Sequence, residues 1–132
     1  MDTKMDSGDN KALIGNSFPW SLVRQKLVAE PLTLEQFRAE TAGVRMVSFW
    51  GHPDTLAAAS EFCGMDLTPK VERTVLTLSV NNLPALAGEE FTCCYVISPN
   101  YAESFRQPLA PEAQVEHAIT GWIILRMRWE NC

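Results

Sequence analysis

The stretch VSFWGHPDTLAAASEFCG, residues 47–64, places a histidine between an apolar strand-like run and a helix-like run. Proline is favoured at the first helical position, so Pro53 makes His52 the predicted N-cap of a helix. Free backbone N–H groups at a helix start attract phosphate, and a histidine there could protonate a leaving phosphate-ester oxygen. Asp54 argues against this, because its carboxylate would repel a phosphate. On spacing alone, a histidine that only fills the turn is favoured over a catalytic one.

Other residues that could carry chemistry show no recognised spacing. The four cysteines form no C-x-x-C pair and no zinc-like cluster with histidine, so we expect no metal and no cofactor. His117, the second histidine, has no partner at metal spacing. No G-x-S-x-G, H-E-x-x-H or P-loop pattern occurs. The four tryptophans could stack on bases, although such residues more often lie in a core.

The formal net charge of −5 argues against broad binding of duplex nucleic acid. It leaves room for a small anionic ligand in a local pocket. No apolar run approaches the ~20 residues that span a bilayer, and the polar start shows no signal peptide. We therefore expect a cytoplasmic protein with free thiols and no membrane partner.

The length of 132 residues suits one domain with a proper core. Residues 1–10 are polar and read as a disordered tail, which leaves a single domain over 11–132. Strands are predicted over residues 12–16, 44–50, 72–80, 91–98 and 117–130, and helices over 33–43 and 53–63. This mixture of strands and short helices indicates an α+β fold with a mixed sheet flanked by short helices.

Three of these elements carry more detailed expectations. Thr33 and Gln36 form a capping box at the start of helix 33–43, and Gly43 ends it. The run 44–50 is nearly all apolar, which is typical of a central strand covered on both faces. Residues 72–98 are predicted to form one long hairpin around a loop at 81–90. The last strand should place Trp122, Ile124, Arg126 and Arg128 on one face.

Two blocks of this sequence match motifs of a known family. After a short strand, Asn16, Ser17, Phe18 and Leu22 match Asn-(Ala/Ser)-Phe-x-x-x-(Met/Leu). The second block is Gly-His-x-x-Thr, a helical stretch and Cys-Gly, matched by Gly51, His52, Thr55, Cys63 and Gly64. Over roughly residues 12–98 the chain resembles the viral type III anti-CRISPR ring nucleases and their bacterial relatives.

The resemblance implies a homodimer that binds cyclic tetra-adenylate in a pocket across its interface and opens the ring without a metal. In that family the ribose 2′-hydroxyl attacks the adjacent phosphorus, and a histidine, matched by His52, is the general acid for the leaving 5′-oxygen. The ligand-binding positions that the resemblance implies are Asn16, Ser17, Phe18, Ser21, Gly51 and Thr55.

The chain departs from the family where an Arg-x-x-Glu motif follows a strand. Pro99 stands at the place of the arginine, and Glu103 and Arg106 supply the same residue types later, in reversed order. We expect Arg106, held by Glu103, to replace the missing guanidinium, and turnover to be weaker than is usual in the family. The strand 117–130 has no counterpart in the family, and its residues 122–125 offer apolar surface for a dimer interface.

Three functions follow from these observations. The first is a viral or cellular ring nuclease that switches off type III CRISPR signalling in the cytoplasm. The second is a non-enzymatic sponge that sequesters a cyclic or adenine-based nucleotide signal. The third is a protein-interaction module on the same fold.

Overall fold

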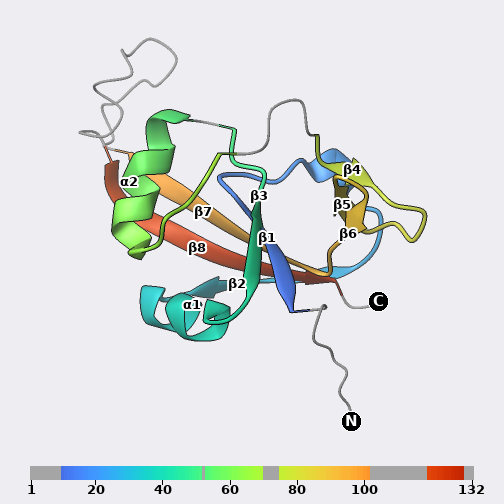
Figure 1. Cartoon of the computed structure of the whole chain (residues 1–132), viewed down its shortest axis with the longest axis horizontal. Coiled ribbons are helices and arrows are strands. Elements are labelled where there is room, and N and C mark those ends of the chain that lie inside the picture. Colours follow the sequence, from blue (N-terminus) through green and yellow to red (C-terminus); the bar gives the residue numbers. More distant parts are fainter. Residues whose placement is uncertain (1–9, 52, 70–74, 102–118, 130–132) are drawn as a thin grey trace.

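The computed structural model describes residues 10–51, 53–69, 75–101 and 119–129, and Figure 1 shows their arrangement. The predicted tail over 1–10 lies outside these residues except for Asn10. The elements are, in order, β1 (Lys11–Gly15), the 3₁₀ turn η3 (Trp20–Leu22), β2 (Leu27–Leu32), α1 (Leu34–Thr41), β3 (Arg45–Ser48), α2 (Pro53–Cys63), β4 (Thr77–Leu78), β5 (Pro84–Leu86), β6 (Glu89–Glu90), β7 (Cys93–Tyr101) and β8 (Ile119–Trp129).

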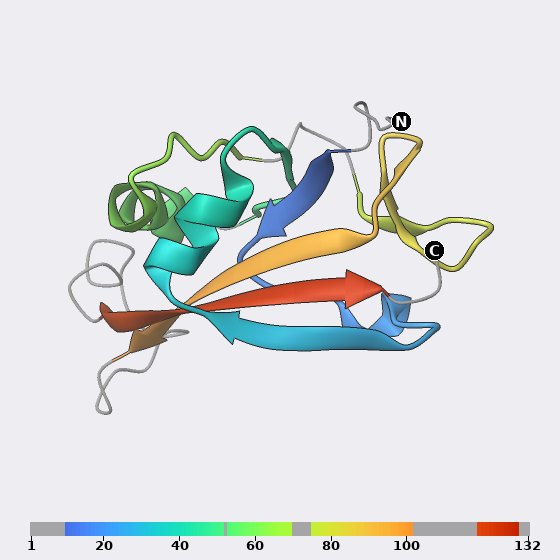
Figure 2. The same ribbon diagram turned by 90° about the horizontal axis from the view of Figure 1, so that it is seen from below.

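A five-stranded mixed sheet has the order β2-β8-β7-β1-β3, and a three-stranded sheet has the order β4-β5-β6. β1 runs parallel to both neighbours, with Leu13 opposite Val47 of β3 and Cys94 of β7. β8 is antiparallel to β7 and to β2. Figure 2 shows the long β7 and β8 crossing the molecule beside β2. The predicted α+β class and mixed sheet are confirmed.

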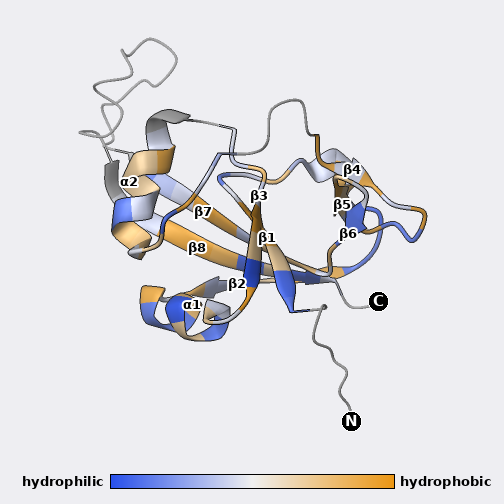
Figure 3. Ribbon diagram, in the orientation of Figure 1, coloured by the Kyte–Doolittle hydropathy of each residue, from blue (hydrophilic) through white to orange (hydrophobic). Residues whose placement is uncertain are grey.

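The large sheet separates two cores, because successive side chains of a strand point to opposite faces. Ile14 packs on one face with Phe37 of α1 and Ala59 of α2. Leu13 packs on the other face with Leu86 of the small sheet. Both helices therefore cover one face, and the small sheet covers the other. Figure 3 shows that β7 and β8, which serve both cores, are largely hydrophobic.

Helix α1 forms where its capping residues predict. The Thr33 hydroxyl accepts a hydrogen bond from the Gln36 backbone N–H at 3.0 Å, and the Gln36 side chain accepts one from the Thr33 N–H at 2.9 Å. Gly43, at a φ of +81°, follows the helix in the left-handed conformation that glycine adopts most easily. Phe37 and Thr41 form the buried face.

The predicted central position of strand 44–50 is wrong. β3 lies at the edge of the sheet, paired only with β1 among the described strands. Its apolar residues still serve both cores, since Met46 packs on the helix face and Val47 on the other face. The segment after α2 runs beside this edge, where the Ser48 hydroxyl donates to the Thr68 carbonyl. Burial on two faces does not require a second neighbouring strand.

The predicted hairpin over 72–98 is also wrong. β4 pairs with β5, and β5 with β6, so the predicted loop at 81–90 contains two short strands. β7 instead pairs with β1 and β8. Residues 70–74 lie outside the described residues. β2, which pairs along β8 from Leu27 to Leu32, was not predicted either.

β8 has the faces that its sequence predicts, but it lies between β2 and β7 inside the sheet. Ile124 is only 3% exposed, and the Trp122 ring stacks on Phe62 of α2 at 5.4 Å. The run 122–125 is therefore not one exposed apolar patch, and only Ile123 of these four is strongly exposed. In the described part of the chain, no helix is both long enough and apolar enough to cross a membrane.

The turn between β5 and β6 gives a first prediction. Ala87 and Gly88 both have positive φ, at +52° and +83°, which is the geometry of a type I′ hairpin turn. A left-handed alanine is strained, whereas Asn-Gly suits this turn. Ala87→Asn should raise the free energy of unfolding by about 0.5–1 kcal/mol in urea denaturation. Ala42→Asn is the matched control, because Ala42 is also exposed but has a φ of −62°. An equal gain in both variants would contradict the strain argument.

Candidate functional site

The carboxyl ends of β1, β3 and β7 meet at one edge of the large sheet, because these three strands are parallel. The chain leaving β1 turns to the face of the small sheet, where Phe18 is buried. The chain leaving β3 turns to the opposite face, where α2 packs. Figure 1 shows the two connections diverging beyond β1 and β3. In open sheets with parallel strands, ligands bind outside the strand ends where neighbouring connections diverge in this way. This region is therefore the candidate site, and we call it the crevice.

Asn16 ties the three strand ends together. Its side-chain oxygen accepts a hydrogen bond from the Gly51 backbone N–H at 3.4 Å, across 35 positions of sequence. Its carbonyl accepts a hydrogen bond from the Ser98 hydroxyl of β7 at 3.0 Å. The Phe49 N–H donates to the Ile14 carbonyl at 2.9 Å and extends the contact between β1 and β3. Residues from both motif blocks are therefore neighbours at this edge.

Ser98 belongs to the candidate site, although sequence reasoning missed it. It stands at the end of the predicted strand 91–98, where a polar side chain follows an apolar run. That pattern is the signal that could have identified it, since polar residues at the carboxyl ends of parallel strands gather at one edge. Asn100 follows two positions later on the same face of β7 and is exposed.

The buried pair of Trp50 and Thr55 connects the end of β3 to α2. The Trp50 indole N–H donates to the Thr55 hydroxyl at 3.2 Å, and the two residues are 1% and 3% exposed. The Trp50 backbone N–H also donates to the Ser48 hydroxyl at 3.1 Å. These bonds fix the path of the chain on both sides of residue 52. Thr55 thus supports the site from inside the fold.

The other predicted ligand-binding residues differ in exposure. Ser17, Ser21 and Gly51 are exposed, Asn16 is half-buried and Phe18 is buried. Apart from the chain neighbours of Gly51, no described atom lies within 4 Å of the position that a side-chain carbon would take there. The predicted catalytic residues His52, Glu103 and Arg106 lie outside the described residues, as does His117.

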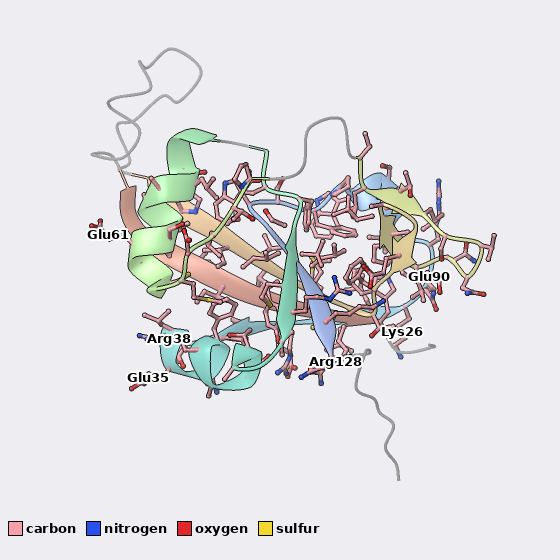
Figure 4. The ribbon with its side chains drawn as sticks, viewed as in Figure 1. Lys26, Glu35, Arg38, Glu61, Glu90 and Arg128 are labelled. Atoms are coloured by element: carbon pink, nitrogen blue, oxygen red, sulfur yellow. The ribbon has the colours of Figure 1, made fainter. Side chains whose placement is uncertain are left out.

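Pro99 occupies a regular position in β7, opposite Trp122 of β8. Four of the described arginines lie away from the carboxyl ends of β1, β3 and β7. Arg45 begins β3, Arg126 and Arg128 pair with the first half of β7, and Arg38 approaches Gly64 at the far end of α2. Figure 4 shows Arg128 at the end of the molecule where β1 begins. Arg24 is exposed in the connection after η3.

Arg126 takes part in a structural network that joins α1 to the sheet. Its guanidinium donates to Glu40 at 2.7 Å and also pairs with Glu30, and the Tyr95 hydroxyl donates to Glu40 at 2.6 Å. Desolvation raises the pKa of Glu40, but the hydrogen bonds from Tyr95 and Arg126 and the nearby arginine charges together lower it below its usual value. Desolvation and the bond to Glu40 raise the pKa of Tyr95. These groups hold α1 in place and do not face the crevice.

The described cysteines are not poised as nucleophiles. Burial raises the pKa of the Cys63 thiol to about 11, and the charge of Arg38 offsets this only in part. Burial likewise raises the pKa of Cys93 and of Cys94. A thiol reacts as its thiolate, so these groups are unreactive near neutral pH. Within the described ranges, no three His, Cys, Asp or Glu side chains are grouped to hold a metal ion.

An open groove of about 1320 Å³ lies along the small sheet, away from the crevice. Its lining includes Lys11, Ser79, Asn81, Glu89 and Glu90, and none of the predicted site residues. Lys11 is the first residue of β1, whereas the crevice begins after its last, roughly 16 Å further along the strand. The groove and the crevice are therefore separate features of the molecule.

The fold defines an α+β protein whose candidate site is the edge where the carboxyl ends of β1, β3 and β7 meet. No family model matches the sequence, and a search of curated proteins finds no significant match. Among solved structures the chain is similar to B116 of Sulfolobus turreted icosahedral virus, with a TM-score of 0.47 and 12% sequence identity. The similarity covers 91% of this chain and 99% of the viral protein.

Proposed function

We propose that this protein binds a cyclic oligonucleotide, with cyclic tetra-adenylate as the first candidate, in the crevice at the ends of β1, β3 and β7. The observation that carries the proposal is the hydrogen bond from the Gly51 N–H to Asn16. It joins the two sequence blocks that match the ring-nuclease motifs, at the place in the fold where ligands of such sheets bind.

The crevice offers groups that suit a phosphate ester. Ser17 and Ser21 are exposed hydroxyls, which are common donors to phosphate oxygens. No described atom beyond its chain neighbours crowds Gly51, and α2 begins two residues later at Pro53, so the first N–H groups of a helix of 11 residues lie close by. A homodimer belongs to this proposal, because a ring with two-fold symmetry is matched by two copies of one site.

The proposed reaction is an internal transfer at phosphorus. The 2′-hydroxyl of one ribose loses its proton to solvent water as it attacks the adjacent phosphorus and forms a 2′,3′-cyclic phosphate, and the bond from phosphorus to the 5′-oxygen breaks. His52, as general acid, gives its proton to that leaving oxygen. The ring is thereby opened to a linear product without an added nucleophile.

Binding without turnover is the second candidate, and the arginine positions favour it. Pro99 has neither charge nor N–H group to offer a developing phosphate charge, and Arg38, Arg45, Arg126 and Arg128 lie elsewhere. Arg106, with Glu103, remains the proposed substitute. Incubation with labelled cyclic tetra-adenylate distinguishes the two candidates, because cleavage yields linear products and sequestration returns the intact ring. A panel of cyclic nucleotides that gives neither binding nor a thermal shift would contradict both.

Asn16→Ala tests the observation on which the proposal rests. Loss of the bond to Gly51 should loosen the crevice and weaken the affinity for cyclic tetra-adenylate by about tenfold in calorimetry. Asn10→Ala is the matched control, because Asn10 flanks the other end of β1 and donates to the Gly43 carbonyl at 3.3 Å. It should leave the affinity unchanged. Equal affinities in the two variants would show that Asn16 does not shape the binding site.

A further inference from the structure

Trp20 is the one aromatic side chain that is strongly exposed among the described residues, at 73%. It begins η3, in the connection that leaves the end of β1. Trp50 and Trp129 are each only 1% exposed, so two of the other three indoles are fully buried. An exposed tryptophan keeps a large apolar surface in water, which folding alone does not favour.

The turn that carries Trp20 is anchored on both sides. The Phe18 ring packs against Trp129 at 5.5 Å and edge-on against Phe49 at 6.3 Å. Leu22 packs on the same core. The turn is closed by the Leu22 N–H bond to the Pro19 carbonyl at 3.1 Å and the Val23 N–H bond to the Trp20 carbonyl at 3.0 Å. The indole is thus held outward on a fixed backbone, so a ligand would order little of the chain on binding.

The composition of the segment that carries Trp20 favours a nucleobase over an apolar protein surface. Residues 16–29 contain Arg24 and Lys26 and no carboxylate, in a chain whose formal net charge is −5. The chain neighbours of Trp20, Pro19 and Ser21, are exposed, and so is Arg24. An aromatic face near hydroxyl and cationic groups is the combination that binds single-stranded nucleic acid, where the ring stacks on a base and the polar groups meet the backbone.

We infer that Trp20 is a base-stacking residue of the crevice, with its indole face taking one adenine of the bound ring while Ser17 and Ser21 meet the sugar-phosphate backbone. This inference rests on the proposed function. Trp20 is four residues from Asn16, a chain length that spans at most about 14 Å. A ring of four nucleotides carries its bases outward from its phosphates, so one base can reach the indole while a phosphate lies beside Gly51.

The test compares Trp20→Ala and Trp20→Phe with wild type by calorimetry against cyclic tetra-adenylate. Trp20→Ala should weaken binding by about 5- to 100-fold, and Trp20→Phe should recover most of that loss, because a phenyl ring still stacks. Val80→Ala is the matched control, since Val80 is 97% exposed in the turn between β4 and β5, and it should bind like wild type. None of the three should shift the unfolding midpoint by more than a degree or two, because exposed side chains contribute little to stability.

The outcomes separate the inference from the proposed function. If wild type binds the ring and Trp20→Ala binds equally well, the stacking role is wrong and the proposed function stands. If wild type binds no cyclic oligonucleotide, the proposed function fails and the stacking role with it. If Trp20→Ala changes the oligomeric state in light scattering and leaves the affinity unchanged, Trp20 contacts protein, and the inference is overturned.

Discussion

Replacement of His52 by alanine is expected to slow single-turnover cleavage of cyclic tetra-adenylate by about 10²- to 10⁴-fold, which is the usual contribution of a general acid. The affinity should change little, because the proposed role of His52 is to protonate the leaving 5′-oxygen in the transition state. An interaction made only in the transition state lowers the rate and leaves ground-state binding intact. Rapid mixing of excess protein with labelled ring, followed by separation of linear products, measures this rate.

The second histidine of the chain provides the control. His117→Ala removes the same side chain from a position that neither motif block includes, and it should cleave at the wild-type rate. Unchanged cleavage in His52→Ala would remove His52 from the mechanism. Tight binding by wild type with no linear product would instead establish sequestration, and His52 would then be a residue of the turn between Gly51 and Pro53.

Trp50→Ala is expected to lower the free energy of unfolding by about 3–5 kcal/mol, the cost of removing a fully buried large aromatic side chain. The indole fills the core between β3 and α2 and donates to the Thr55 hydroxyl. Its loss leaves a cavity and a buried hydroxyl without that donor. Urea denaturation, with the slope checked for two-state behaviour, measures the change.

Thr55→Val separates the hydrogen bond from the packing. Valine keeps the shape of threonine but cannot accept the indole N–H, so the cost should be only roughly 1–2 kcal/mol. The same variant should also slow any cleavage, because Trp50 and Thr55 lie on either side of residue 52 and fix the chain there. A loss below 1 kcal/mol in Trp50→Ala would contradict the supporting role that we assign to this pair.

If cleavage is slow, binding alone can still serve a protein that depletes a scarce nucleotide signal. The described arginines support that outcome, because Arg45 is paired with Glu89 and Arg126 with Glu30 and Glu40. These cations are engaged in holding strands and α1 together. In the proposed function, phosphate would therefore be met by hydroxyls, backbone N–H groups and Arg24, or by residues outside the described ranges.

Local patterns in the sequence determined several elements directly. The capping box of Thr33 and Gln36 set the start of α1, and a positive-φ glycine followed its end. The proline at position 53 and the glycine at 64 bounded α2. The alternation of β8 correctly separated its two faces. Each of these features depends on residues within a few positions of one another, which is the range over which capping and periodicity act.

The order of strands and the make-up of the crevice were decided by tertiary structure. An apolar run such as 44–50 indicates that both faces of the strand are covered. It does not indicate how many strands lie beside it, so the edge position of β3 could not be derived from the sequence. The small sheet of β4, β5 and β6 depends likewise on which partners meet after the chain has folded. Ser98 and Asn16 are 82 positions apart, and only the parallel pairing of β1 with β7 brings them together. No local pattern in the sequence separates the buried tryptophans from the exposed one. The anchored turn after β1 leaves Trp20 in solvent, whereas Trp50 and Trp129 are buried, because burial is set by contacts between distant segments.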